Sequence, residues 1–237
     1  MLYQFVDCRW ELMDAEAGRR AYLAGHVPGA SFLDIDLDLS DLSVTDAGRH
    51  PLPSAEKFAA SAGRAGIGVG VFVVTYGSGG GPERLWWLLR HFGHDACAVL
   101  LGGIETWGGE LRAGEEEIEP RDFVPHERDG DTIEADELVR RLSDPSLALV
   151  DARAASRWRG EPNPIDDPPG RIPGAANAPW MEPFPDELPP GELVAYCGSG
   201  VSSCVTLHRA WLAGREGRLY PGSWSEWSKR GLPIERS

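Results

Sequence analysis

The sequence predicts an α/β fold made of two domains, each a parallel sheet flanked by helices. Two observations predict it: short apolar runs alternate with amphipathic helical segments, and one ordered set of motifs occurs twice along the 237 residues. That length suits two domains of ordinary size. With 42% hydrophobic and 25% charged residues, the composition is that of a globular protein.

The duplication rests on four motifs that recur in the same order in each half. They are residues 6–9 and 150–153, 25–30 and 170–175, 73–77 and 193–197, and 102–107 and 222–227. Four matched motifs in one order indicate a tandem repeat. The halves are unequal, because Ala30 and Tyr76 are 46 positions apart whereas Ala175 and Tyr196 are 21 apart. The additional residues of the first half cover the Asp-rich segment 34–53.

The strands and the helix of the first half are predicted from the pattern of apolar residues and from the glycines and prolines that bound them. Residues 70–75 form a short apolar run that begins at a glycine, which is typical of a buried parallel strand. A Gly/Ser turn follows, and then a helix is predicted over 82–92, because its large apolar residues share one face and proline occupies its first turn. A further strand is predicted over 98–101. Strand, turn, helix and strand in this order predict an open parallel sheet.

The second half repeats this arrangement, with a strand predicted over 192–195 and a helix over about 201–213. Between the halves, residues 113–130 contain a run of glutamates, two prolines and no clear period, so we interpret them as a linker. The domains are therefore predicted as 1–112 and 131–237.

Charge and composition exclude several classes of function. A net charge of -14 argues against binding of nucleic acid or of an anionic membrane. No apolar run has the roughly 18 residues of a membrane helix. No secretory signal is visible, so a cytoplasmic location is expected. The chain has two lysines, Lys57 and Lys229, and a site for an anion would therefore depend on arginine. Four scattered cysteines without a Cys-x-x-Cys pair indicate neither a disulfide framework nor a metal site, and no cofactor is expected.

The segment with the strongest chemical signal is Tyr196-Cys197-Gly198-Ser199-Gly200-Val201-Ser202-Ser203. It places a cysteine at the end of a predicted strand and a helix a few residues later, and ligands of open α/β sheets bind at such strand ends. The two glycines allow the backbone to curl so that successive N–H groups point inward. Those groups and the helix N-terminus favour a thiolate. Cys197 is thus a candidate nucleophile, whereas Cys8 and Cys97, on predicted strands, and Cys204, inside the helix, are interpreted as buried structural residues.

These motifs resemble the tandem-domain rhodanese family, which contains thiosulfate and 3-mercaptopyruvate sulfurtransferases. The resemblance spans nearly the whole chain and is most specific in the Cys197 loop and in segments 150–153, 157–160 and 222–227. It implies two rhodanese-like domains, of which only the C-terminal one is catalytic. Gly77 stands at the position of the nucleophile in the first half, which agrees with an inactive N-terminal domain.

The resemblance also implies the reaction. Cys197 would take a sulfur atom from 3-mercaptopyruvate or thiosulfate as a persulfide, and an acceptor such as cyanide or a thiol would then remove it. The loop residues Gly198, Gly200, Val201 and Ser202 would bind the thiolate and the persulfide through their N–H groups. The uncharged loop resembles that of the 3-mercaptopyruvate enzymes, in which the loop serine pairs with a histidine and an aspartate. In this sequence those residues are Ser199, His50 and Asp36, and such a relay would move a proton as the enolate of pyruvate leaves.

Two arginine positions bear on the donor. Arg157 matches the arginine with which the family binds the donor's anion, and its planar fork suits bidentate contact with oxygens. A second arginine of many 3-mercaptopyruvate enzymes falls near Ile165, where this sequence has none. Arg171 replaces the histidine that usually precedes the Ile-Pro-Gly-Ala segment.

Two other functions remain open at this stage. A non-enzymatic persulfide carrier would use Cys197 only to pass sulfur to a partner. A phosphatase of the same fold would need arginine after Cys-x₅, and residue 203 is serine.

Overall fold

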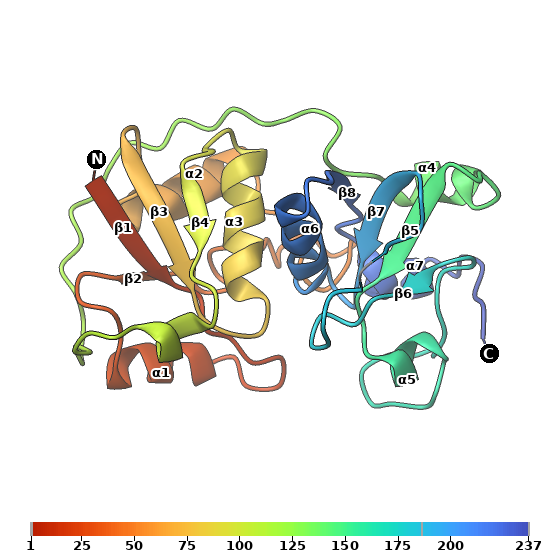
Figure 1. The fold of residues 1–237 in the computed structure, drawn as a ribbon, viewed down its shortest axis with the longest axis horizontal. Helices are drawn as coiled ribbons and strands as arrows, with labels where there is room; N and C mark the ends of the chain where they lie inside the picture. Colours follow the sequence, from red (N-terminus) through yellow and green to blue (C-terminus); the bar gives the residue numbers. More distant parts are fainter. Residues whose placement is uncertain (1, 186, 237) are drawn as a thin grey trace. The chain divides into compact units, whose positions relative to one another are not determined.

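The computed structural model describes residues 2–185 and 187–236, and it divides into two compact units (Figure 1). The first comprises Met1–Asp41 and Leu52–Arg128, and the second comprises Leu42–Pro51 and Asp129–Ser237. Residues 42–51, which lie within the additional segment of the first half, therefore pack with the second unit. No described helix has the length and apolar character needed to cross a membrane.

The first unit contains a four-stranded parallel sheet in the order β2-β1-β3-β4. Its elements in chain order are β1 (Leu2–Asp7), α1 (Ala17–Ala24), β2 (Ser31–Phe32), α2 (Ala55–Arg64), β3 (Val71–Tyr76), α3 (Gly81–His91), β4 (Cys97–Val99) and the 3₁₀ turn η1 (Gly103–Thr106).

The second unit repeats that topology in the order β6-β5-β7-β8, again with every pair parallel. Its elements are α4 (Ala135–Arg141), β5 (Leu147–Asp151), α5 (Ala155–Trp158), β6 (Ala176–Asn177), β7 (Glu192–Tyr196), α6 (Ser203–Leu212), β8 (Gly217–Leu219) and α7 (Ser223–Lys229). The predicted α/β class and the duplication are confirmed by this shared strand order.

Most predicted boundaries agree with the structure to within one or two residues. The clearest difference is the strand predicted over 98–101, which is Cys97–Val99 in the structure. The chain turns after Leu100, where Gly103 N donates to Leu100 O at 3.1 Å and Gly102 adopts a φ of 83°. Cys8 lies one residue beyond β1 rather than on it.

The repeated Val-Asp-x-Arg motif ties the end of one central strand to a distant turn in each unit. In the second unit Arg153 binds Asp151 through Nε (3.0 Å) and Nη2 (2.6 Å), and its Nη2 also donates to Gly170 O at 2.7 Å. Both charged side chains are fully buried. A buried ion pair needs further hydrogen bonds to offset the desolvation of its charges, and the bond from Arg153 to Gly170 O is one of them. Asp7 and Arg9 repeat the arrangement in the first unit.

The core of the second unit packs against the strand that carries the candidate nucleophile. Tyr196, Tyr220, Trp224 and Trp227 are buried in one cluster. Each buried polar atom finds a partner, as expected for aromatic residues with a polar tip: Tyr196 Oη accepts from Ile172 N at 3.1 Å, for example. This packing fixes the end of β7 against the start of α7.

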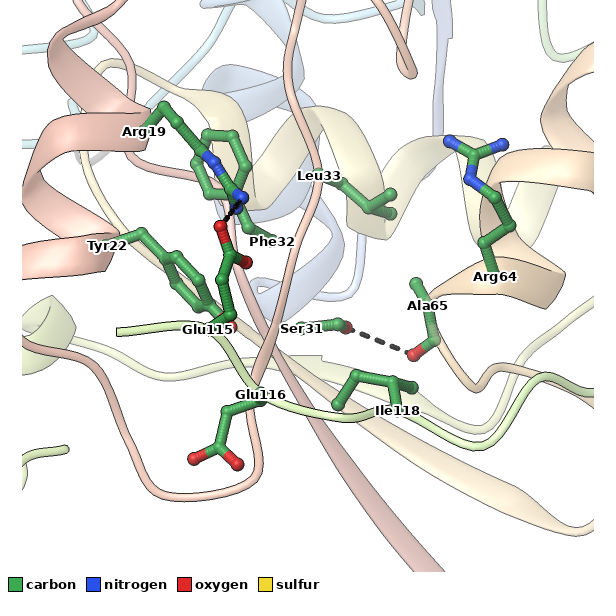
Figure 2. Close-up of a pocket in the computed structure, with 10 residues that line it drawn as sticks. All are labelled: Arg19, Tyr22, Ser31, Phe32, Leu33, Arg64, Ala65, Glu115, Glu116 and Ile118. Atoms are coloured by element: carbon green, nitrogen blue, oxygen red, sulfur yellow. Dashed lines mark hydrogen bonds and ion pairs between the residues drawn. The ribbon is translucent and has the colours of Figure 1, made fainter. Parts of the chain in front are cut away.

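A cavity of about 280 Å³ lies in the first unit beside β2, and Figure 2 shows its lining. Arg19 pairs with Glu115 at its rim, and Ser31 Oγ donates to Ala65 O at 3.0 Å. Arg64, which also lines it, pairs with Asp38 at 2.6 Å. None of the site residues predicted from the sequence lines this cavity, and its arginines already have carboxylate partners.

Candidate active site

Cys197 directly follows β7, and the start of α7 holds its backbone in place. Cys197 N donates to Ser223 Oγ at 3.1 Å, and Cys197 O accepts from Trp224 N at 2.9 Å. Ser223 has a φ of 52°, an uncommon value for a residue with a side chain. Its Oγ also donates to Tyr220 O at 3.0 Å. These bonds hold the strained residue in the conformation that anchors the candidate nucleophile.

The loop after Cys197 curls as its glycines predict. Gly200 adopts a φ of 83°, and a Cβ there would lie 2.6 Å from Pro221 O. Its N–H donates to Cys197 Sγ at 3.2 Å. Val201 follows, and its carbonyl accepts from Cys204 N at 3.1 Å where α6 begins. Glycine is therefore required at 200, both by conformation and by space.

The loop favours the thiolate of Cys197 even though the side chain is only 1% exposed. Burial by itself raises the pKa, but the hydroxyls of Ser202 and Ser203 and the N–H groups of Ser199 and Ser203 outweigh it, so that the pKa of Cys197 is lowered. The buried Oγ of Ser203 makes no hydrogen bond of ordinary geometry within residues 2–185 and 187–236, so we ascribe to it the weaker effect of a nearby dipole. The hydroxyl of Ser202 therefore contributes more to the lowered pKa of Cys197.

Ser199 and His50, which are far apart in sequence, meet in the second unit. His50 Nδ1 lies 2.7 Å from Ser199 Oγ, and both residues are buried. The segment that carries His50 packs against the start of α7: Arg49 N donates to Ser225 Oγ at 2.9 Å, and a Cβ on Gly48 would lie 2.4 Å from Gly222 O. The structure thus brings together Ser199 and His50, both predicted for the relay.

Asp36, the third, belongs to the first unit. It is half-buried and follows β2 within the turn of Asp34, whose Oδ1 accepts from Asp36 N at 2.7 Å.

Arg157 is held differently from the expectation. Its Nε and Nη2 bind the two oxygens of Asp166, each at 2.6 Å. Asp166 also accepts from Arg153 Nη1 at 3.2 Å. Burial raises the pKa of Asp166, but the guanidinium groups of Arg157, Arg153 and Arg49 outweigh that effect and lower it. The Nε–Nη2 edge of Arg157, which we expected to bind a substrate anion, therefore binds the carboxylate of Asp166. The remaining N–H groups of Arg157 are left for another anion.

The same guanidinium explains the glycine next to the nucleophile. A Cβ on Gly198 would lie 2.9 Å from Arg157 Nη2 and 2.8 Å from Arg49 Nη2. The glycine at 198 therefore permits two arginines to approach the Cys197 loop. Arg171 has a structural role, because it pairs with Glu235 and lies 4.0 Å from the centre of the Trp158 ring.

Comparisons with known proteins identify relatives over most of the chain. The rhodanese-like domain family matches residues 2–110 and 134–230. The human 3-mercaptopyruvate sulfurtransferase is 34% identical over 97% of this chain and 86% of its own length. A Mycobacterium tuberculosis relative, named provisionally as a thiosulfate sulfurtransferase, is 35% identical over 94% of this chain and 87% of its own. The structure of 3-mercaptopyruvate sulfurtransferase from Leishmania major superposes with a TM-score of 0.81 at 30% identity, over 96% of this chain and 70% of that one.

The chain belongs to the rhodanese-like family. The two predicted rhodanese-like domains are confirmed by the double match and by the paired sheets. The prediction that this rhodanese-like protein is a sulfurtransferase enzyme is confirmed by its relatives, two named above and a third from Escherichia coli that is 33% identical over 98% of the chain. Within residues 2–185 and 187–236, no cluster of His, Cys, Asp and Glu side chains is arranged to ligate a metal.

Three residues of this rhodanese-like site were not predicted from the sequence. Arg49 and Asp166 lie in segments without a regular pattern, and the Ser223 hydroxyl that accepts from Cys197 N looks like any serine at the start of a helix. The repeated motif at 222–227 marked that segment, but it did not indicate contact with the candidate nucleophile.

We expect the thiolate of this rhodanese-like protein to form below the ordinary thiol pKa, and Ser202→Ala to move its formation to higher pH. Removing a hydroxyl that stabilises the anion raises the pKa, and the expected shift is on the order of one unit. The rate of Cys197 alkylation by iodoacetamide, followed against pH, gives the midpoint for each protein. An unchanged midpoint in the variant would show that the backbone N–H groups alone stabilise the thiolate.

Proposed function

We propose that this protein transfers sulfur from 3-mercaptopyruvate to a thiol or to cyanide through a persulfide on Cys197. The observation that supports this most is the Cys197 loop, in which a buried thiolate is favoured and Ser199 is hydrogen-bonded to His50. Thiosulfate as the donor would need the first feature only. The contact between Ser199 and His50 therefore favours 3-mercaptopyruvate.

The first half-reaction forms a sulfur–sulfur bond. The Cys197 thiolate attacks the donor's sulfur, the donor's carbon–sulfur bond breaks, and its electron pair stays on carbon as the enolate of pyruvate. The enolate needs a proton, and the donor's thiol releases one. Ser199, hydrogen-bonded to His50 Nδ1, is placed to pass that proton from sulfur to carbon. Cys197 is left as a persulfide anion.

The second half-reaction uses the same loop. Cyanide or a thiol attacks the outer sulfur, the sulfur–sulfur bond breaks, and its electron pair returns to Cys197 as the thiolate. Gly200 N–H, which donates to Sγ, and the neighbouring N–H groups of Gly198, Val201 and Ser202 stabilise negative charge at both stages.

Asp36 is proposed to complete the relay by orienting His50. A carboxylate that accepts from the second ring nitrogen of a histidine fixes its tautomer, so that Nδ1 can serve the serine. The proposal rests on the resemblance to the 3-mercaptopyruvate enzymes.

We further propose that residues 131–237 form the catalytic domain and that 113–130 are the linker. Residues 1–112 are proposed to be catalytically inactive in the sense that they hold no nucleophile of their own, although they contribute His50 and Asp36 to the relay. Gly77 occupies the nucleophile position of the first half with a φ of 145°. A Cβ there would lie 2.6 Å from Arg9 N and 2.7 Å from Cys8 C. A cysteine at 77 would therefore clash with the backbone, which supports the assignment of a single nucleophile.

The donor is tested by steady-state rates with 3-mercaptopyruvate and with thiosulfate, with cyanide as the acceptor. We expect a higher kcat/KM with 3-mercaptopyruvate. A preference for thiosulfate would overturn the assignment of donor, and no turnover with either compound would support the persulfide carrier instead.

The substitution Ser199→Ala tests the role of Ser199 in proton transfer separately from the anion-binding role of the Cys197 loop. We expect kcat with 3-mercaptopyruvate to fall on the order of 10²-fold, because general acid–base catalysis contributes at least that much. The rate with thiosulfate, whose sulfite leaves without a proton, serves as the internal control and should change little. Equal losses with both donors would indicate that Ser199 only supports the loop.

A further inference from the structure

Arg49 reaches the Cys197 loop from outside the predicted catalytic domain. It lies within residues 42–51, which pack with the second unit. Its backbone N donates to Ser225 Oγ at 2.9 Å, and its Nη1 donates to Ile165 O at 3.2 Å. These two contacts, one at each end of the residue, orient the guanidinium group. The second contact is made at the position where the sequence lacks the arginine of related enzymes.

The two arginines at the loop differ in which donors they have left. Both Nη2 atoms lie within 3 Å of the point where a Cβ of Gly198 would be, at 2.8 Å for Arg49 and 2.9 Å for Arg157. Arg157 Nε and Nη2 both donate to Asp166. In contrast, Arg49 Nε is buried and has no hydrogen-bond partner within residues 2–185 and 187–236.

Leaving a buried N–H without an acceptor destabilises the folded state, and the effect is larger when the group is charged. Such an atom therefore calls for an explanation in function. Nε and Nη2 form the edge with which a guanidinium binds two oxygens of a carboxylate. In Arg49 this edge has one orphaned donor, and its other nitrogen lies beside the residue that follows the nucleophile.

Local charge supports an anion at this point. Three guanidinium groups, of Arg49, Arg153 and Arg157, gather around two carboxylates, of Asp151 and Asp166. The Cys197 thiolate is the third anion of this group, so the site is close to neutral in a chain whose net charge is -14. Burial lowers the pKa of Arg49, which Asp166 and the Cys197 thiolate partly oppose. An additional anion would stabilise the buried cation further.

We propose that the Nε–Nη2 edge of Arg49 binds the carboxylate of the sulfur donor and takes the place of the arginine that is missing at Ile165. The proposal rests on the proposed donor, because it assigns the contact to the carboxylate of 3-mercaptopyruvate. A neighbouring Arg157 N–H group contributes to the same anion site, while Asp166 holds Arg157 in position.

The kinetic test compares Arg49→Met and Arg49→Lys with Arg140→Met. Arg140 is an exposed arginine of α4, so its replacement changes the net charge equally and should leave the rates unchanged. For Arg49→Met we expect KM for 3-mercaptopyruvate to rise on the order of 10- to 100-fold, the range of a charged hydrogen bond. Lysine should restore only part of this loss, since it keeps the charge without the fork.

A second measurement does not depend on sulfur transfer. The rate of Cys197 alkylation is measured with anionic iodoacetate and with neutral iodoacetamide, and the ratio of the two rates reports the affinity of the site for a carboxylate. We expect this ratio to fall at least tenfold in Arg49→Met. A residue that merely supports the loop would change both rates together, and an unchanged ratio would overturn the proposal. If Arg49→Met does not fold, Arg49→Lys carries the test.

The two measurements separate the proposals. Suppose that the native protein does not turn over 3-mercaptopyruvate but that the alkylation ratio still falls in Arg49→Met. The anion site at Arg49 would then stand, and 3-mercaptopyruvate would be rejected as the donor. Normal KM in Arg49→Met, with turnover intact, would instead reject Arg49 as the carboxylate ligand and leave the proposed function standing.

Discussion

Replacement of Cys197 by serine is expected to abolish sulfur transfer, with kcat reduced by about 10⁴-fold or more, as for the loss of other catalytic nucleophiles. A serine hydroxyl remains protonated where the Cys197 loop favours a thiolate, and its oxygen cannot accept sulfur as a persulfide. The serine side chain fits the same buried space, so the fold should persist. Steady-state assays with either donor and cyanide measure the loss.

The matched control is Cys97→Ser in the first unit. Burial raises the pKa of Cys97 to about 12, so it remains a thiol at neutral pH. Its replacement should leave kcat within a few-fold of the native value. Mass spectrometry of the donor-treated native protein should locate one added sulfur atom on the peptide that carries Cys197. Sulfur on the Cys97 or Cys204 peptide, or turnover by Cys197→Ser, would refute the assignment of the nucleophile.

Local signals account for the part of the molecule that the sequence predicted well. A glycine that needs a positive φ, such as Gly200, leaves its mark in the sequence next to the cysteine it serves. The parallel strands follow from the apolar runs, and the repeat indicates that each half forms the same kind of sheet. The order of the strands within each sheet is known only from the structure. The candidate nucleophile and the curl of its loop could therefore be predicted without coordinates.

The remainder of the site depends on contacts that sequence patterns do not encode. Ser199 and His50 are separated by 149 positions, and only the resemblance to a family indicated that they meet. Asp166 lies in a proline-rich loop, and nothing in its neighbours indicates two buried arginines. Arg49 precedes His50, yet its approach to Gly198 depends on how residues 42–51 pack against α7. The pairing of Arg157 Nε and Nη2 with Asp166 could not be predicted for the same reason.

Asp166→Asn is expected to lower the free energy of unfolding by about 3 kcal/mol, because it leaves two guanidinium groups without their shared buried carboxylate. Asp166 is 4% exposed and contacts both Arg153 and Arg157. Loss of its charge should also release Arg157 from its position over Gly198, so KM for the donor should rise while the pH midpoint of Cys197 alkylation stays nearly constant. Urea unfolding and donor kinetics measure the two effects.

The pH dependence of the stability loss distinguishes the ion pair from a packing defect. The guanidinium groups lower the pKa of folded Asp166 below its ordinary value of 3.8. Its contribution to stability is therefore complete above that value and is lost as the pH falls through the lower, folded pKa. The difference between the native protein and Asp166→Asn should be largest near neutral pH and shrink in acid. Asp167→Asn, an exposed neighbour with the same change of charge, should show little loss at any pH. A loss of equal size at neutral and acidic pH would mean that Asp166 stabilises the loop by shape, and Arg157 would then need another explanation for its position.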